Sequence, residues 1–141
     1  MMESEDDLDR FLEGFENGTW PKEKWTHQAH VVMGGCYVLA HGVETATRLA
    51  RERIPRYNVA QGGENTDANG YHETLTVFWI RVIAAFLSAL PVAHSRLEKI
   101  RALSEHFGTR RDLFKSYYSY DVVQSKAARR EWVPPDLREL G

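Results

Sequence analysis

Four residues in two short segments have side chains that could carry chemistry. His27 and His30 follow Trp25 in one segment, and His72 and Glu73 are adjacent in the other. Imidazole and carboxylate groups bind metal ions and transfer protons near neutral pH. A soluble helical domain does not need so many of them beside apolar stretches. We therefore expect a site in which these four residues are catalytic, and the segments alone do not reveal its substrate.

The spacing of the histidines favours a shared ligand. His27 and His30 are three residues apart, so on a helix they occupy the same face one turn apart. With His72 they form a predicted metal-ligand set, and Glu73 would act as a base, an orienting group or a fourth ligand. Three imidazoles suit zinc, two imidazoles and a carboxylate suit non-haem iron, and nickel is a further divalent candidate.

Two metal-free interpretations of the same residues stay open. In one, the histidines and Glu73 form a binding or proton-transfer site without any cofactor. In the other they are structural: His27 bonds a carbonyl group, His30 fills a polar gap in the core, and His72 with Glu73 caps a helix. An acidic residue near a helix N-terminus is favourable on electrostatic grounds alone.

The residues expected to contact substrate lie around these segments. A polar, turn-rich loop over residues 61–70 leads directly into Tyr71, and such loops often carry function. Near the C-terminus, an arginine beside hydroxyl groups could clamp a carboxylate or phosphate, although a solvated amphipathic helix is the alternative. The expected partner is a small polar or anionic metabolite. The predicted substrate-binding residues are Trp25, Asn65, Tyr71, Tyr117 and Arg129.

The apolar pattern is helical along almost the whole chain. Ser4 should cap a first helix that ends at Asn17-Gly18, and Thr19 with Pro21 should start a second one that runs to about Ala40. The adjacent Gly34 and Gly35 imply close approach by another helix or a ligand. Three more helices are expected over 43–58, 71–90 and 95–106, with Pro55 bending or shortening the first of them. The prediction is an all-α irregular bundle of five to seven helices around the apolar helix at 71–90.

Composition narrows the class of protein. The 141 residues are 43% hydrophobic and 27% charged, which suits one soluble domain covering 1–141. A net charge of −2 offers no basic surface for nucleic acid, and no apolar run approaches a membrane span. The acidic N-terminus predicts no leader, so we expect a cytoplasmic protein of bacterial type. The single cysteine, Cys36, lies in an apolar run and is expected to be a buried, unreactive thiol.

Three phrases of the sequence resemble a known group of proteins. They are 19–30 (TWPKEKWTHQAH), 65–76 (NTDANGYHETLT) and 132–137 (WVPPDL). Their W-T-H-x-A-H and G-Y-H-E-T-L-T signatures are similar to those of small bacterial helical proteins, about 140 residues long, of unassigned activity. The resemblance spans 11–137 and implies a compact single domain. It carries over no catalytic residue.

The sequence thus predicts a small-molecule enzyme whose pocket contains histidine and glutamate side chains. One version of this prediction includes a divalent metal ion in the pocket. Two alternatives come from other classes. One is a ligand- or metal-binding sensor without turnover. The other is an interaction protein that forms a homodimer through apolar helix faces, because apolar positions lie on several sides of the 71–90 helix.

Overall fold

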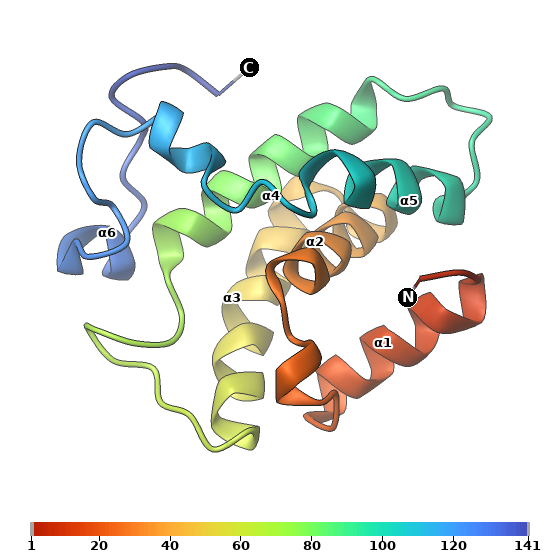
Figure 1. The fold of residues 1–141 in the computed structure, drawn as a ribbon, viewed down its shortest axis with the longest axis horizontal. Coiled ribbons are helices and arrows are strands. Elements are labelled where there is room, and N and C mark those ends of the chain that lie inside the picture. The colour runs from red at the N-terminus through yellow and green to blue at the C-terminus, as the bar shows by residue number, and fades with distance from the viewer. Residues whose placement is uncertain (1, 141) are drawn as a thin grey trace.

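The computed structural model describes residues 2–140, and in that range the chain is helical with no strand (Figure 1). The predicted all-α class is confirmed. In chain order the elements are α1 (Glu5–Asn17), η1 (Lys22–Lys24), α2 (His27–His41), α3 (Val43–Ala60), α4 (Glu73–Ser88), α5 (Arg96–Phe107), η2 (Leu113–Ser116) and α6 (Lys126–Arg130), where η denotes a short 3₁₀ helix.

Local capping chemistry sets most of the helix ends. The Ser4 hydroxyl accepts a hydrogen bond from the Asp7 N–H at the start of α1, and Gly18 ends that helix with φ of 80°. The expectation that Thr19 starts the second helix is wrong. That stretch forms only the 3₁₀ turn η1, and α2 begins after Thr26, whose hydroxyl accepts from the Ala29 N–H. The true cap therefore stands immediately before His27.

Pro55 lies inside α3 without shortening it, so of the two effects predicted for this proline, bending or shortening, shortening does not occur. The helix continues five residues beyond the proline, to Ala60. Ile54 and Tyr57 on this part of the helix are buried, and the Tyr57 hydroxyl donates to the Trp20 carbonyl at 2.6 Å. Burial of the apolar face thus holds the helix together where proline removes one backbone hydrogen bond.

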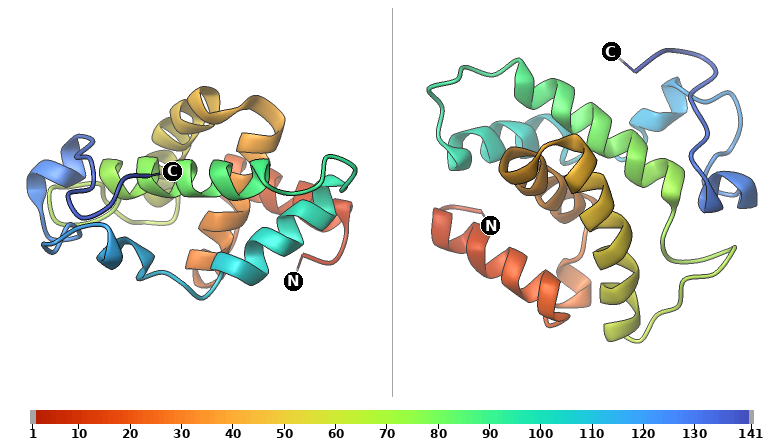
Figure 2. Two further views of the ribbon diagram at one scale, coloured as in Figure 1. Left: turned by 90° about the horizontal axis from the view of Figure 1, so that it is seen from above. Right: turned by 180° about the vertical axis from the view of Figure 1, so that it is seen from behind.

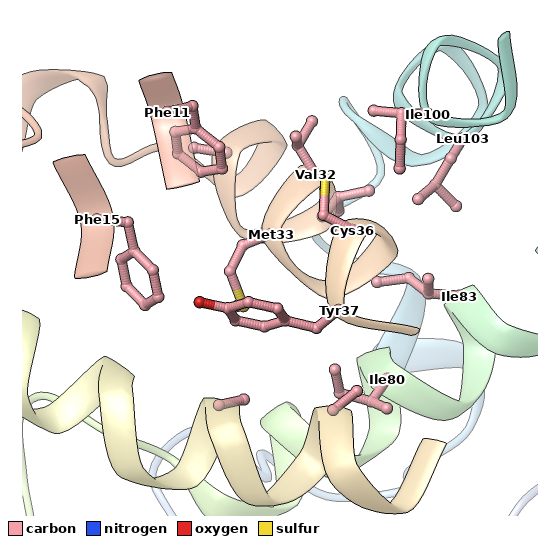
Figure 3. Packing of buried hydrophobic residues seen from close by; sticks show 14 of the residues in the cluster. Phe11, Phe15, Val32, Met33, Cys36, Tyr37, Ile80, Ile83, Ile100 and Leu103 are labelled. Carbon is pink, nitrogen blue, oxygen red and sulfur yellow. The ribbon is translucent and has the colours of Figure 1, made fainter. Parts of the chain in front are cut away.

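The glycine pair in α2 allows two helices to approach it closely. α2 packs against α3, α4 and α5. A Cβ on Gly34 would lie 2.9 Å from Ile83 of α4, and a Cβ on Gly35 would lie 2.5 Å from Leu103 of α5. Figure 3 shows the isoleucines of α4 and the apolar side chains of α5 gathered around α2. The predicted close approach is therefore made by two helices, one for each glycine.

α4 connects this core to the C-terminal part of the chain. It packs against α2, α3, α5 and α6, as expected for a central helix. The C-terminal segment lies at its N-terminal end, while α5 lies along its C-terminal half (Figures 1 and 2). Thr74 joins α4 to the C-terminal segment, because its hydroxyl donates to the Glu131 carbonyl at 2.7 Å and accepts from the Val133 N–H at 3.0 Å. Among the helices of residues 2–140, none combines the length and the apolar character that crossing a membrane requires.

Candidate functional site

The two predicted segments meet at one large cavity, which we call the main cavity. Its volume is about 1080 Å³, and its wall comes from the start of α2, the end of α3, the first half of α4 and the irregular segment 111–123. Six of the sequence-predicted residues line it: Trp25, His27, His30, Tyr71, His72 and Arg129. Distant parts of the chain therefore meet at this cavity, and the roles of the individual residues differ.

His30 presents one unbonded ring nitrogen near the main cavity. Its Nδ1 lies 2.7 Å from the Thr26 carbonyl oxygen, and its ring lies 3.8 Å from that of Trp25, centroid to centroid. A carbonyl oxygen can only accept, so Nδ1 carries the proton and Nε2 holds a lone pair. Burial lowers the pKa of His30 from 6.5 to about 4, more than the Thr26 carbonyl raises it, and the nearby His27 lowers it further. The ring is neutral near neutral pH.

His27 is arranged in the same way with the opposite nitrogen. Its Nε2 donates to the carbonyl oxygen of Phe107, at the end of α5, across 3.0 Å. The lone pair is therefore on Nδ1, for which residues 2–140 provide no hydrogen-bond partner. Burial lowers the pKa of His27, and the positive charge of Arg111 lowers it further. Two neutral imidazoles, each with one free acceptor nitrogen, thus stand one helical turn apart.

His72 lines the same cavity, but both of its ring nitrogens are already bonded. Nε2 donates to the Val122 carbonyl at 2.9 Å, and Nδ1 accepts from the Leu75 N–H at 3.2 Å as the N-cap of α4. The side chain is 7% exposed, and burial lowers its pKa. His72 therefore fits the structural interpretation: it starts a helix and pins the segment that covers the cavity.

Glu73 faces a second, smaller cavity of about 440 Å³. Arg51 Nε lies 3.1 Å from both carboxylate oxygens, Arg51 Nη2 lies 2.6 Å from Oε2, and the Tyr71 hydroxyl donates to Oε1 at 2.6 Å. Burial raises the pKa of Glu73, but the bonds from Arg51 and Tyr71 outweigh this and lower it overall. The carboxylate is charged and fully engaged, and it is not on the wall that carries His27 and His30.

The ligand set predicted for a metal ion is incomplete in this geometry. Within residues 2–140, no group of three or more His, Cys, Asp or Glu side chains is placed to hold a metal ion. Only His27 and His30 offer free nitrogens, whereas a catalytic zinc site ordinarily has three protein ligands. His72 would have to give up its bond to Val122 or Leu75 to join them. Binding of zinc, iron or nickel therefore stays a prediction.

The remaining predicted residues fall into two groups. Trp25 and Tyr71 line the main cavity, and Arg129 lines it while its guanidinium donates to the carbonyls of Gly70, Tyr71 and Val123. Asn65 and Tyr117 are elsewhere. Asn65 fastens the loop before α4 through bonds to Asn58, Pro55 and Tyr71. The Tyr117 ring packs against Phe78 and under the Arg138 guanidinium.

Several residues of the site were missed by sequence reasoning. Thr76 and Trp79 of α4 line the main cavity, and the Trp79 ring lies 4.8 Å from that of His27, centroid to centroid. The sequence did indicate these two residues, because they lie one and two helical turns after His72. Arg51 had no local signal, since it is an exposed residue 22 positions before its partner Glu73. No protein-family model, curated protein or solved structure matches the chain.

Proposed function

We propose that this protein binds a small molecule in the main cavity and that His27 and His30 are hydrogen-bond acceptors for it. One observation carries the proposal: two neutral imidazoles on one cavity wall each have their proton held by a main-chain carbonyl and their lone pair unbonded. A cavity of about 1080 Å³ is large enough for a drug-sized molecule, since such sites ordinarily measure about 300–1,000 Å³.

Enzymatic turnover in the same cavity is the second candidate, and the free Nε2 of His30 favours it. A lone pair at that position could remove a proton from a bound molecule. The resulting imidazolium would gain little from the protein, because Nδ1 faces a carbonyl rather than a carboxylate and the pKa of His30 is about 4. Turnover therefore requires a substrate that develops negative charge beside His30. A sensor without turnover requires no such charge.

A binding screen with a matched control tests the proposal. The probes are aromatic amides, alcohols, amines and carboxylic acids, and the readout is the thermal unfolding temperature. A ligand at one hundred times its Kd stabilises the protein by about 2.7 kcal/mol. The variants are His30→Gln in the cavity and His41→Gln at the exposed end of the same helix. We expect stabilisation by at least one probe, weakened about tenfold or more in Kd by His30→Gln and unchanged by His41→Gln.

Two further results decide between the candidates. Conversion of a stabilising probe into product, followed by mass spectrometry, would establish an enzyme, and its absence with retained binding would support a sensor. If no probe stabilises the protein, or if both glutamine variants bind equally well, the cavity is not a ligand site of the kind proposed.

A further inference from the structure

Asn58, on the wall of the main cavity, donates one amide proton to Asn65 and retains the other. Four other half-buried polar side chains of this wall share a property that the sequence does not show: their protons are already committed to the protein. This holds for His27 and His30, whose N–H groups face carbonyl oxygens. The Tyr71 hydroxyl donates to the Glu73 carboxylate at 2.6 Å, and the Thr76 hydroxyl donates to the His72 carbonyl at 2.8 Å. Each of the four side chains therefore retains only lone pairs for a bound molecule.

Arg129, the one half-buried cation of the wall, has most of its terminal N–H groups engaged by the protein as well. Its two terminal nitrogens point at three main-chain carbonyls, where they hold the loop before α4 against segment 111–123. The other charged residues of the wall are exposed to solvent and balance in sign. They are Arg111, Asp112, Lys115 and Asp121.

We infer that the main cavity selects an uncharged ligand head with two or more hydrogen-bond donors, such as a primary amide, carried on an apolar body. This inference rests on the proposed small-molecule site and names its ligand class. Lone pairs that face a ligand accept hydrogen bonds from its N–H or O–H groups. The same lone pairs repel an anion. No half-buried carboxylate of the wall would balance a buried cation. Of the small polar or anionic metabolite that the sequence predicted, this class keeps the polar form and excludes the anionic one.

The apolar body has its own wall. Trp25 and Trp79 are half-buried, so part of each indole ring is available to a ligand, and both rings contact the acceptor histidines. Apolar side chains of α4 continue this surface, including Ile80 and Ile83. Burial of an aromatic or aliphatic group against them supplies affinity, while the four acceptors supply selection.

The proton positions can be measured without any ligand. Nitrogen NMR of labelled imidazole rings distinguishes the two neutral tautomers. We expect the Nδ1–H form for His30 and the Nε2–H form for His27 near neutral pH. The opposite tautomer at either histidine would place a donor in the cavity and overturn the inference, whether or not a ligand is known.

A matched set of probes tests the selection itself. Benzamide, N,N-dimethylbenzamide, benzoate and benzylammonium share one aromatic body and differ in donors and charge. With Trp fluorescence as readout, we expect benzamide to bind about tenfold or more tightly than each of the others. Thr76→Val removes one acceptor with little change in volume and should narrow that preference, whereas His41→Gln should leave it unchanged.

The outcomes separate this inference from the proposed function. If the dimethyl, anionic or cationic probe binds as tightly as benzamide, the ligand class is wrong while the binding site stands. If no probe binds at millimolar concentration, the proposed function fails and the ligand class fails with it.

Discussion

His30 should make the stability of the protein depend on pH in a range where few other groups titrate. Its pKa is lowered from 6.5 in the ordinary state to about 4 in the fold, because burial outweighs the bond from Nδ1 to the Thr26 carbonyl. Above about pH 7 the ring is neutral in both states and contributes no difference. Between the two pKa values the unfolded chain binds a proton that the folded chain does not bind.

The sign and size of the effect follow from this difference. The unfolded state holds more protons in this window, so stability falls as pH decreases. Each tenfold difference in proton affinity corresponds to about 1.4 kcal/mol. The free energy of unfolding should therefore fall by about 2 kcal/mol from His30 alone between about pH 7 and about pH 5. His27 and His72 have pKa values lowered mainly by burial, so they add in the same direction.

Urea unfolding of matched variants isolates the contribution of His30. His30→Gln removes the titrating ring, and His41→Gln removes a ring at the exposed end of the same helix. The difference in stability between the parent protein and His30→Gln should shrink by about 2 kcal/mol as pH falls from about 7 to about 5. The difference measured for His41→Gln serves as the reference for losing a histidine from the same helix. A constant difference for His30→Gln would show that the ring binds protons equally in the folded and unfolded states, and would refute the burial argument.

Three other changes test the packing and the charge pair. Gly35→Ala should destabilise the protein by about 1–3 kcal/mol, because its Cβ would lie 2.5 Å and 2.8 Å from two side chains of α5. Gly34→Ala should destabilise it less, because only one contact of its Cβ is under 3.0 Å. A lower urea midpoint for Gly34→Ala than for Gly35→Ala would contradict the two-helix contact. Glu73→Gln should cost about 2 kcal/mol in the same assay by weakening the bond to Arg51, while a retained tautomer pattern in nitrogen NMR would show that the main cavity is intact. Cys36 is 2% exposed and burial raises its pKa to about 12, so a thiol reagent should react with it only after unfolding, and rapid labelling of the native protein would disprove its burial.

Helix boundaries were the most predictable part of the fold, because caps act over three or four residues. Ser4 and Gly18 stand where the sequence placed the ends of the first helix, and α5 begins and ends within one residue of the predicted 95–106. Thr19 was misjudged, since the competing cap at Thr26 outweighs its local signal. α3 continues past Pro55 because its apolar face is buried. Local propensity is a weak contribution beside tertiary burial.

The residues of the site were predictable only in part. His27, His30 and His72 were selected for their chemistry, and all three line the main cavity, but the sequence left open whether they would meet there. The roles of Asn65 and Tyr117 as ligand contacts stay predictions, although neither lines that cavity. Residue type alone does not distinguish a wall residue from one that fastens a loop.

Residue types and spacing were enough to identify a helical domain and the histidines that could share a site. The availability of each ring nitrogen required three dimensions, because the groups that occupy them lie far away in the chain. His27 bonds a carbonyl 80 residues later, and His72 bonds one 50 residues later. Glu73 is held by a guanidinium 22 residues earlier. Hydrogen bonds act over about 3 Å, so a free lone pair and an occupied one look identical in the sequence until packing brings their partners together.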